Sequence, residues 1–366
     1  MSASGGLLCR LNFTFYEAVR FGAITFSRDY VMNISDYSEE HLAGQRIMAG
    51  FEGTGLSGGL KFLIDTVKVG GVILFAGNVK TPEQIKNLCE SIQDYAGSIG
   101  QPPLIISIDQ EGGQVARLKE PFTVFPGNPA MKSEEDAVQF AATTASELFG
   151  VGINMNMAPV MDVAPEGVLS VMAGRVFGHD PYRVSKMGVA VIEGLQENKI
   201  MAVAKHFPGI GRTLLDSHLD LPSFDAGLSD MESFDLIPFE AAIRHNVAGI
   251  MLSHILYTGI DGKWPASLSV KIAKELLRDR MCYEGIVMTD DLDMGAVKKH
   301  FNIRTAVRQI LSAEIDMMLI CHAGPDIESA FEEILKNMRD SAKIRADAEI
   351  SVRRILRHKE KFLPGW

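Results

Sequence analysis

The stretch Met201-Ala-Val-Ala-Lys-His206 joins an uninterrupted apolar run to two polar residues at its end. A continuous apolar run of this kind is typical of a strand buried on both faces, as in a parallel sheet. The following residues, Phe207-Pro-Gly-Ile-Gly211, contain two Gly and a Pro, which indicate a tight loop. The stretch therefore predicts a buried parallel strand that delivers Lys205 and His206 to a loop at its carboxyl end.

Seven more short apolar runs occur along the chain, with amphipathic segments between them. In chain order, and with the first run in its place, they are Gln45–Phe51, Gly71–Phe75, Leu104–Ile108, Ile153–Val160, Met201–His206, Ala248–His254, Gly285–Thr289 and Asp316–Cys321. Helix-like segments include residues 81–95, 133–149, 180–197, 231–245 and 303–311. Eight alternations of strand and helix predict a single (β/α)8 barrel of the TIM type. The competing fold is a doubly wound open sheet, but its Gly-rich sequence after the first strand is missing.

Polar residues follow the ends of these runs with a regularity that supports the barrel. Asp109 ends the third run, Arg175 lies in the loop after the fourth, Lys205 and His206 close the fifth, and His254, Asp290 and His322 close the sixth, seventh and eighth. In TIM-type barrels the active site forms at the carboxyl ends of the strands, on the βα loops. We therefore expect these side chains to meet at one catalytic mouth.

The barrel accounts for most of the chain. We expect residues 39–366 to form one (β/α)8 catalytic domain, and residues 1–38 to form an N-terminal extension to which the sequence assigns no role. The aromatic residues of the extension, among them Phe13, Phe15, Tyr16, Phe21, Phe26 and Tyr30, suggest that it packs against another part of the protein. Residues 350–358 are predicted to form a helix near the C-terminus.

Composition narrows the class of protein. Of the 366 residues, 46% are hydrophobic and 22% charged, and the formal charge of -10 disfavours a nucleic-acid partner. The four widely spaced cysteines match no metal-binding pattern and favour a reducing compartment. No apolar run reaches the roughly 18 residues of a membrane span, and the first 30 residues do not read as a signal peptide. We expect a cytoplasmic protein without membrane partner, metal or other cofactor, and the oligomeric state is open.

A second polar group follows the Lys205–Gly211 loop, at Asp216-Ser217-His218. An imidazole has a pKa of about 6.5, so His218 can both donate and accept a proton near neutral pH. A carboxylate on its other ring nitrogen fixes the tautomer and stabilises the charged form. These residues predict an acid/base pair of His218 and Asp216, although a simple loop hydrogen bond is the alternative.

The seventh run ends in Thr289-Asp290-Asp291. A buried carboxylate is costly unless it is paired or hydrogen-bonded, so an Asp here points to chemistry or to capping. One of the two Asp residues is expected to cap the helix that follows. The other, flanked by cationic loops, would stay ionised and suits a catalytic nucleophile.

The third run continues into Asp109-Gln-Glu-Gly-Gly113, with Arg117 shortly after it. Asp109 can accept hydrogen bonds from two ligand hydroxyls, Arg117 can donate several, and the Gly pair permits close approach of a ligand. A plain strand and turn is an equally good interpretation of this segment alone.

Together these segments resemble the family 3 glycoside hydrolases that act on β-N-acetylglucosaminides. The matching motifs are KHFPGHG…DSH, TDD-L-x-M, DQEGGRVxR and R-[ST]-FG, and they occur in the family's order over residues 39–325. The resemblance implies Asp290 as the nucleophile, Asp216 and His218 as the acid/base dyad, and Asp109, Arg117, Arg175, Lys205 and His206 as sugar-binding residues. Three positions depart from the motifs, namely Gln114, Val176 and Ile210, the last of which replaces a His.

The resemblance implies a retaining exo-β-N-acetylglucosaminidase that removes terminal GlcNAc from β-glycosides through a covalent glycosyl-Asp intermediate. It further suggests peptidoglycan (muropeptide) fragments as substrates. Alternatives on the same fold are a β-N-acetylglucosaminide phosphorylase and a β-glucosidase or xylosidase. From other classes come a metal-dependent barrel hydrolase, with His206, His218 and His254 among its ligands, and an inactive sugar-binding protein.

Overall fold

The structure, a computed structural model of the chain, describes residue 34 and residues 37–363. Eight parallel strands close into a barrel in the order β1-β12-β11-β9-β7-β6-β3-β2. They are β1 (Ile47–Gly50), β2 (Gly71–Leu74), β3 (Ile105–Ile108), β6 (Met155–Asn156), β7 (Met201–Phe207), β9 (Gly249–Leu252), β11 (Ile286–Asp291) and β12 (Met317–Ile320). Each strand falls within, or overlaps, one predicted apolar run, so the predicted barrel is confirmed.

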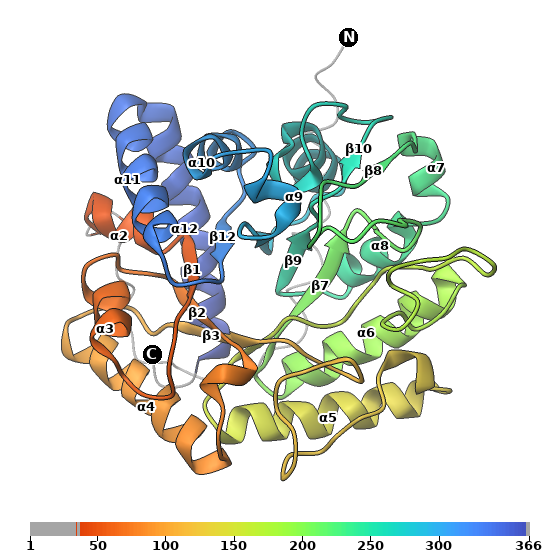
Figure 1. The fold of residues 1–366 in the computed structure, drawn as a ribbon, viewed down its shortest axis with the longest axis horizontal. Coiled ribbons are helices and arrows are strands. Elements are labelled where there is room, and N and C mark those ends of the chain that lie inside the picture. The colour runs from red at the N-terminus through yellow and green to blue at the C-terminus, as the bar shows by residue number, and fades with distance from the viewer. Residues whose placement is uncertain (1–33, 35–36, 364–366) are drawn as a thin grey trace, which may run out of the picture.

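Helices surround the barrel as an outer layer (Figure 1). They are α2 (Glu39–Gly44), α3 (Gly58–Asp65), α4 (Pro82–Ser98), α5 (Glu134–Gly150), α6 (Pro181–Glu197), α7 (Leu228–Glu232), α8 (Leu236–Arg244), the π-helix η5 (Lys271–Arg280), α9 (Gly295–Lys298), α10 (Ile303–Ser312), α11 (Pro325–Asp340) and α12 (Ala342–Phe362). The 3₁₀ turns are η2 (Ala76–Asn78), η3 (Asn128–Ala130) and η4 (Ala266–Leu268). Two small sheets, β4 (Gln110–Gly112) with β5 (Val115–Ala116) and β8 (Ser223–Phe224) with β10 (Leu256–Tyr257), lie on the loops.

Most predicted helices agree with the structure to within a few residues, but one is divided. Residues 231–245 were expected to form one helix, whereas α7 ends at Glu232 and α8 begins at Leu236. Asp235, between them, is buried and forms an ion pair with Arg212. This tertiary contact outweighs the helical periodicity of the sequence.

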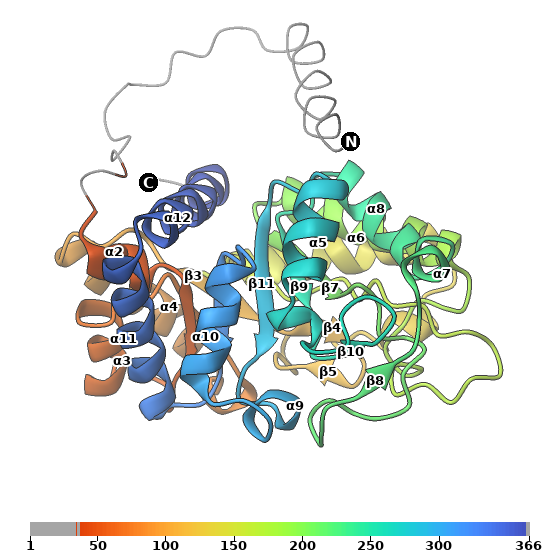
Figure 2. The ribbon, with the colours of Figure 1, turned by 90° about the horizontal axis from the view of Figure 1, so that it is seen from above.

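The two ends of the barrel are closed differently. At the amino ends of the strands, Ile355 and Phe362 of α12 and the following Leu363 pack against the methionine-rich barrel interior, which includes Met155 and Met317. Figure 2 shows α12 at this end, while α9 and the small sheets lie at the opposite one. The carboxyl ends of the strands are therefore the end left open for a site.

A fully buried lysine lies at the closed end of the barrel. Lys359 of α12 is fully buried, and its Nζ donates a hydrogen bond to Gln45 Oε1 at 2.7 Å. Burial lowers the pKa of this lysine to about 7. When the pKa of a lysine is lowered in the folded state, its burial destabilises the fold, and this free-energy cost is largest at a pH below the folded pKa. The cost disappears as the pH rises from the folded pKa toward the pKa of the unfolded chain.

We therefore expect Lys359→Met to change the pH dependence of stability. Between pH 7 and pH 10 the wild-type free energy of unfolding should rise, relative to that of the variant, by about 1.4 kcal/mol per pH unit. Urea unfolding at several pH values measures this difference. The exposed Lys336→Met is the control and should give parallel curves. Parallel curves for Lys359→Met as well would contradict the buried, neutral lysine.

None of the helices in the described residues is long and apolar enough to cross a membrane. Most of the predicted N-terminal extension, at residues 1–33 and 35–36, lies outside the described residues. The boundary at residue 38 therefore stays a prediction.

Candidate active site

A pocket of about 280 Å³ opens at the carboxyl ends of the barrel strands. Its polar lining residues are Asp109, Arg117, Arg175, Lys205, His206, His218, Asp290 and Asp291, and its apolar ones include Phe75, Val115, Met251, Met294 and Leu319. Seven of the eight site residues predicted from the sequence are among them. They come from the loops after β3 and β6, from β7 and the loop that follows it, and from the end of β11.

A larger cavity of about 430 Å³ lies at the opposite end of the barrel, beside Phe362 of α12. Among the described residues that line it, Lys199 is the one charged side chain. This cavity brings together no acid and base, so the smaller, charged pocket is the candidate active site.

Backbone irregularities in β7 and β11 bring neighbouring residues to the same pocket. The pairing of β7 with β9 shifts between Lys205 and Phe207, and that of β11 with β12 shifts between Met288 and Asp291. In a regular strand, adjacent side chains point to opposite faces, whereas a bulge redirects one of them. This explains how Lys205 and His206 both line the pocket.

A buried network of opposite charges forms one wall. Lys205 Nζ lies 2.8 Å from Asp109 Oδ1 and 2.6 Å from Glu111 Oε1. Arg117 pairs with the second oxygen of Asp109 at 3.0 Å, and Arg175 binds Glu111 through two hydrogen bonds of 2.7 and 3.0 Å. Each of the three cations is thus held by a carboxylate before any ligand binds.

The electrostatics keep this network ionised. Burial would raise the pKa of Asp109, but the charges of Lys205 and Arg117 outweigh it and hold the pKa well below its usual range. Burial would likewise lower the pKa of Lys205, and the two carboxylates raise it instead. Asp109 therefore remains a hydrogen-bond acceptor at neutral pH, and Lys205 remains a donor.

His206 is oriented by a second buried carboxylate. Its Nδ1–H donates to Asp162 Oδ2 at 2.7 Å, and Asp162 Oδ1 accepts hydrogen bonds from the backbone N–H of His206 and, at 2.8 Å, of Ile210. Asp162 is fully buried. The ring is thereby fixed with Nε2 as the nitrogen available to a ligand. Ile210, which stands where the motif has its second His, contributes through its backbone N–H.

Asp290 lies at the end of β11, and its Oδ1 accepts a hydrogen bond from the Asp291 N–H at 2.8 Å. Burial would raise its pKa, but the charges of His254 and His206, this hydrogen bond and Lys205 together lower it. The carboxylate is therefore ionised at neutral pH, as a nucleophile must be.

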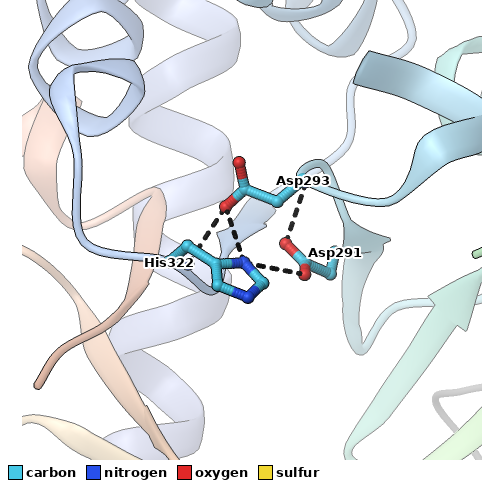
Figure 3. Close-up of side chains that lie close together, drawn as sticks. All are labelled: Asp291, Asp293 and His322. Atoms are coloured by element: carbon cyan, nitrogen blue, oxygen red, sulfur yellow. Dashed lines mark hydrogen bonds and ion pairs between the residues drawn. The ribbon is translucent and has the colours of Figure 1, made fainter. Parts of the chain in front are cut away.

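The neighbouring carboxylates hold the turn after β11 (Figure 3). Asp291 Oδ1 accepts the N–H groups of Asp293 and Cys321, both at 3.0 Å, and Asp293 Oδ2 accepts the N–H of His322 at 3.0 Å. The Nδ1 of His322 lies 3.4 Å from Asp293 and 3.9 Å from Asp291. Lys298 neutralises Asp293. We assign Asp291 and Asp293 to the structure of the turn.

The sequence-based expectation of a helix cap in this segment is wrong. The first residue of α9 is preceded by Met294, which makes no side-chain cap. Asp291 instead accepts N–H groups of the turn and of the residue after β12, because the chain does not enter a helix directly after the strand. Asp290 and Asp291 both line the pocket, and Asp291 also stabilises the turn.

Asp216 and His218 form a pair on the loop between β7 and β8. His218 Nδ1 lies 2.7 Å from Asp216 Oδ1, which also accepts the His218 N–H at 2.9 Å. Partial burial would raise the pKa of Asp216, but the hydrogen bonds and charge of His218 lower it. With Nδ1 bound to the carboxylate, Nε2 is the nitrogen left to exchange a proton in the pocket.

His254 and His322, which were expected at the mouth of the barrel, do not line the pocket. His254 is buried behind the pocket, where Nε2–H donates to the Asp291 carbonyl at 2.8 Å and Nδ1 pairs with the Ser267 hydroxyl at 2.6 Å. Neither of its nitrogens is left for a metal ion. His322 is exposed beside Asp293 and does not line the pocket.

Glu111 and Asp162 are the supporting residues that the sequence analysis missed. Glu111 stands within the Asp109–Gly113 segment, and Asp162 follows the fourth apolar run. A buried charge needs a partner, so a carboxylate close to an apolar run indicates a buried ion pair. This was the signal in the sequence that could have identified Glu111 and Asp162. Their cationic and imidazole partners lie far away in sequence and could not be read from it.

We expect Glu111→Gln to impair both stability and activity. Glu111 is 2% exposed and binds Lys205 and Arg175, so its neutralisation leaves Lys205 with Asp109 alone and removes the carboxylate that pairs with Arg175. Breaking a buried ion pair costs about 3 to 5 kcal/mol. Because the Glu111 pKa is lowered, the stabilisation is present at neutral pH and is lost as the pH falls through the folded pKa.

Chemical denaturation and kcat/KM check this expectation together. The exposed Glu240, which pairs with Arg244, provides the control, since Glu240→Gln should cost under about 1 kcal/mol. Equal effects of the two substitutions would show that the buried network does not hold the pocket.

Comparison with known proteins agrees with this geometry. Residues 57–358 match the glycosyl hydrolase family 3 N-terminal domain. A "Beta-hexosaminidase" of Alkalilimnicola ehrlichii is 37% identical over 285 residues, which cover 75% of this chain and 80% of that protein.

Solved structures agree as well. The family 3 β-N-acetylglucosaminidase of Paenibacillus sp. is 34% identical with a TM-score of 0.84, and the match covers 89% of this chain and 62% of that one. The β-N-acetylhexosaminidase of Beutenbergia cavernae is 27% identical with a TM-score of 0.82, and the match covers 89% of this chain and 99% of that one. The family model spans most of the chain and the identity to the curated relative is well above 30%. The chain therefore belongs to glycosyl hydrolase family 3.

Proposed function

We propose that this chain is a retaining exo-β-N-acetylglucosaminidase that removes terminal GlcNAc from β-glycosides, with peptidoglycan (muropeptide) fragments as its substrates. The observation that carries the proposal is the meeting of Asp290 and His218 in one pocket, beside the buried cations and carboxylates around Asp109. Family membership and the names of the relatives support β-hexosaminidase activity.

In the first step a carboxylate oxygen of Asp290 attacks the anomeric carbon of the terminal sugar. The bond between that carbon and the glycosidic oxygen breaks, and His218 Nε2–H gives its proton to the departing oxygen. Asp216, at 2.7 Å from the other ring nitrogen, stabilises the imidazolium and holds the ring. The products are a glycosyl-Asp290 ester and the free aglycone.

In the second step a water molecule attacks the same carbon and gives a proton to the now neutral His218. The ester bond breaks, and Asp290 regains its charge. Two displacements at one carbon return the original configuration, so the released GlcNAc is the β-anomer.

Recognition of the sugar falls to the cation–carboxylate wall. Asp109, Lys205 and Arg175 present charged acceptors and donors that are already fixed by one another, so little side-chain entropy is lost on binding. The sugar hydroxyls bind to lone pairs and N–H groups that these ion pairs leave open. Arg117, which lies over the Phe75 ring at 5.5 Å, completes this side.

A phosphorylase on the same scaffold is the second candidate. It is favoured by one observation, namely that the acid/base is an imidazole and does not repel an incoming phosphate as a carboxylate would. A β-glucosidase or xylosidase fits less well, because enzymes of these two kinds on the same fold lack the loop with the Asp-x-His pair, which this chain has at Asp216 and His218.

One assay separates these functions. Release of nitrophenol from pNP-GlcNAc should exceed that from pNP-Glc by orders of magnitude, and phosphate should leave the rate and the product unchanged. GlcNAc 1-phosphate in the presence of phosphate would establish the phosphorylase, and a preference for pNP-Glc would refute the hexosaminidase. Dialysis against a chelator, followed by metal analysis, tests the metal-dependent alternative.

The natural substrate and compartment need separate tests. Release of GlcNAc from GlcNAc-anhydro-muramyl peptides, measured against chitobiose, tests the muropeptide proposal. Cell fractionation tests the proposed cytoplasmic location.

A further inference from the structure

The loop that carries the acid/base pair is firmly held at its beginning. Arg212 forms ion pairs with Asp235, which is buried, and with Asp230 at 2.8 Å. Thr213 donates its hydroxyl to the Ile210 carbonyl at 2.7 Å. After this point the loop is open to solvent, since the side chain of Leu214 is 70% exposed.

The part of the loop that contains the dyad is held from another direction. Within the part of the chain that the structure describes, the hydrogen bonds from residues 216–221 to other segments lead to residues 296–300. The contacts are Ala296 N–H to the Ser217 carbonyl at 3.0 Å, Lys299 Nζ to the Leu219 carbonyl at 2.6 Å, and His300 Nε2 to Asp220 Oδ1 at 2.5 Å. Two of the three are made to backbone carbonyls and so act on the course of the loop itself.

Gly295 shows how closely the two segments approach. A Cβ atom at this position would lie 2.6 Å from the His218 carbonyl oxygen and 2.8 Å from that of Leu219. Both distances are shorter than real Cβ contacts, and both neighbours are backbone atoms that cannot rotate away. A larger residue at position 295 would therefore push the dyad loop outward.

We propose that residues 295–300, here called the brace, position His218 over the pocket. The brace begins five residues after Asp290, on the same turn that leaves β11. It therefore ties the loop that carries the acid/base group to the segment that follows the strand with the nucleophile. Gly295, Ala296, Lys299 and His300 are positioning residues, since they act through the loop and do not touch the reacting atoms. The inference rests on the proposed role of His218 as the acid/base.

Gly295→Ala tests the brace by displacing the loop. With an aryl leaving group that needs little protonation, kcat/KM should change by less than about threefold, whereas with a sugar leaving group it should fall by about 10- to 100-fold. Gly227 has an ordinary backbone conformation and nothing within 4 Å of an added Cβ, so Gly227→Ala is the matched control and should behave as wild type. An equal loss for both substrates, or no loss, would overturn the proposal.

Lys299→Met provides a second variant that introduces no clash. Removal of the contact to the Leu219 carbonyl should produce the same dependence on the leaving group, with a smaller loss of kcat/KM than in Gly295→Ala. Amide hydrogen exchange in residues 214–221 should become faster. Lys271 also donates to a loop carbonyl, that of Ile260 at 3.0 Å, but far from the dyad, so Lys271→Met is its control. If Gly295→Ala fails to fold, unchanged exchange and kinetics in Lys299→Met overturn the brace.

A double variant separates failure of the brace from failure of the proposed function. If His218 is the acid/base, His218→Ala alone should show the dependence on the leaving group. Adding Gly295→Ala should then have little further effect, because the group being positioned is gone. A His218→Ala variant without that dependence would refute the acid/base role. A dependence in His218→Ala that is absent from both brace variants would refute only the brace.

Discussion

Asp290→Ala should lower turnover by several orders of magnitude while the protein remains folded. The substitution removes the proposed nucleophile, without which no glycosyl-enzyme should form. The fold should tolerate the change, because the hydrogen bond that the Asp290 carboxylate accepts comes from the neighbouring Asp291 N–H and holds no distant segment in place. Steady-state kinetics on pNP-GlcNAc, together with a melting curve, measure both effects.

Asp225, an exposed aspartate that accepts a hydrogen bond from Thr258, supplies the control for this substitution. Asp225→Ala should keep wild-type kinetics. Substantial residual turnover by Asp290→Ala, within about tenfold of wild type, would show that another group attacks the sugar.

His218→Ala should have the second largest effect, and its size should depend on the leaving group. A sugar aglycone needs a proton to depart, and general acid catalysis of this kind is worth about 10²- to 10⁴-fold. Nitrophenolate needs little protonation, so its departure should be much less affected. Added azide should react with the glycosyl-enzyme without base catalysis, restore turnover of the activated substrate and give a β-glycosyl azide.

Asp216→Asn should act in the same direction as His218→Ala, since the imidazolium loses its charged partner at 2.7 Å. An equal loss for good and poor leaving groups in His218→Ala, with no azide rescue, would remove the dyad from the mechanism.

The barrel and most of its mouth could be predicted because the relevant signals are local. Each strand is a short apolar run buried on both faces, and Lys205, His206 and Asp290 directly end such runs. In a parallel barrel the carboxyl ends of all strands meet at one end, so position along the chain was enough to bring these residues together.

What escaped prediction depends on contacts between distant segments. Glu111 binds Lys205, which lies 94 residues later, and His254 pairs with the Asp291 carbonyl instead of facing the mouth. The register shift near Asp291 changes which side chains point into the pocket, and no periodicity in the sequence announces it. The brace likewise joins residues about 80 positions apart.

The covalent intermediate is the central claim, and trapping it is the most direct test. An activated 5-fluoro glycoside of GlcNAc should form the glycosyl-enzyme faster than water removes it. Trypsin should then release the peptide of residues 281–298, which contains Asp290, Asp291 and Asp293. The account predicts that fragmentation of this peptide assigns the added sugar mass to Asp290, and that Asp290→Ala carries no label. Label on Asp291 or Asp293, or label that persists in Asp290→Ala, would contradict it.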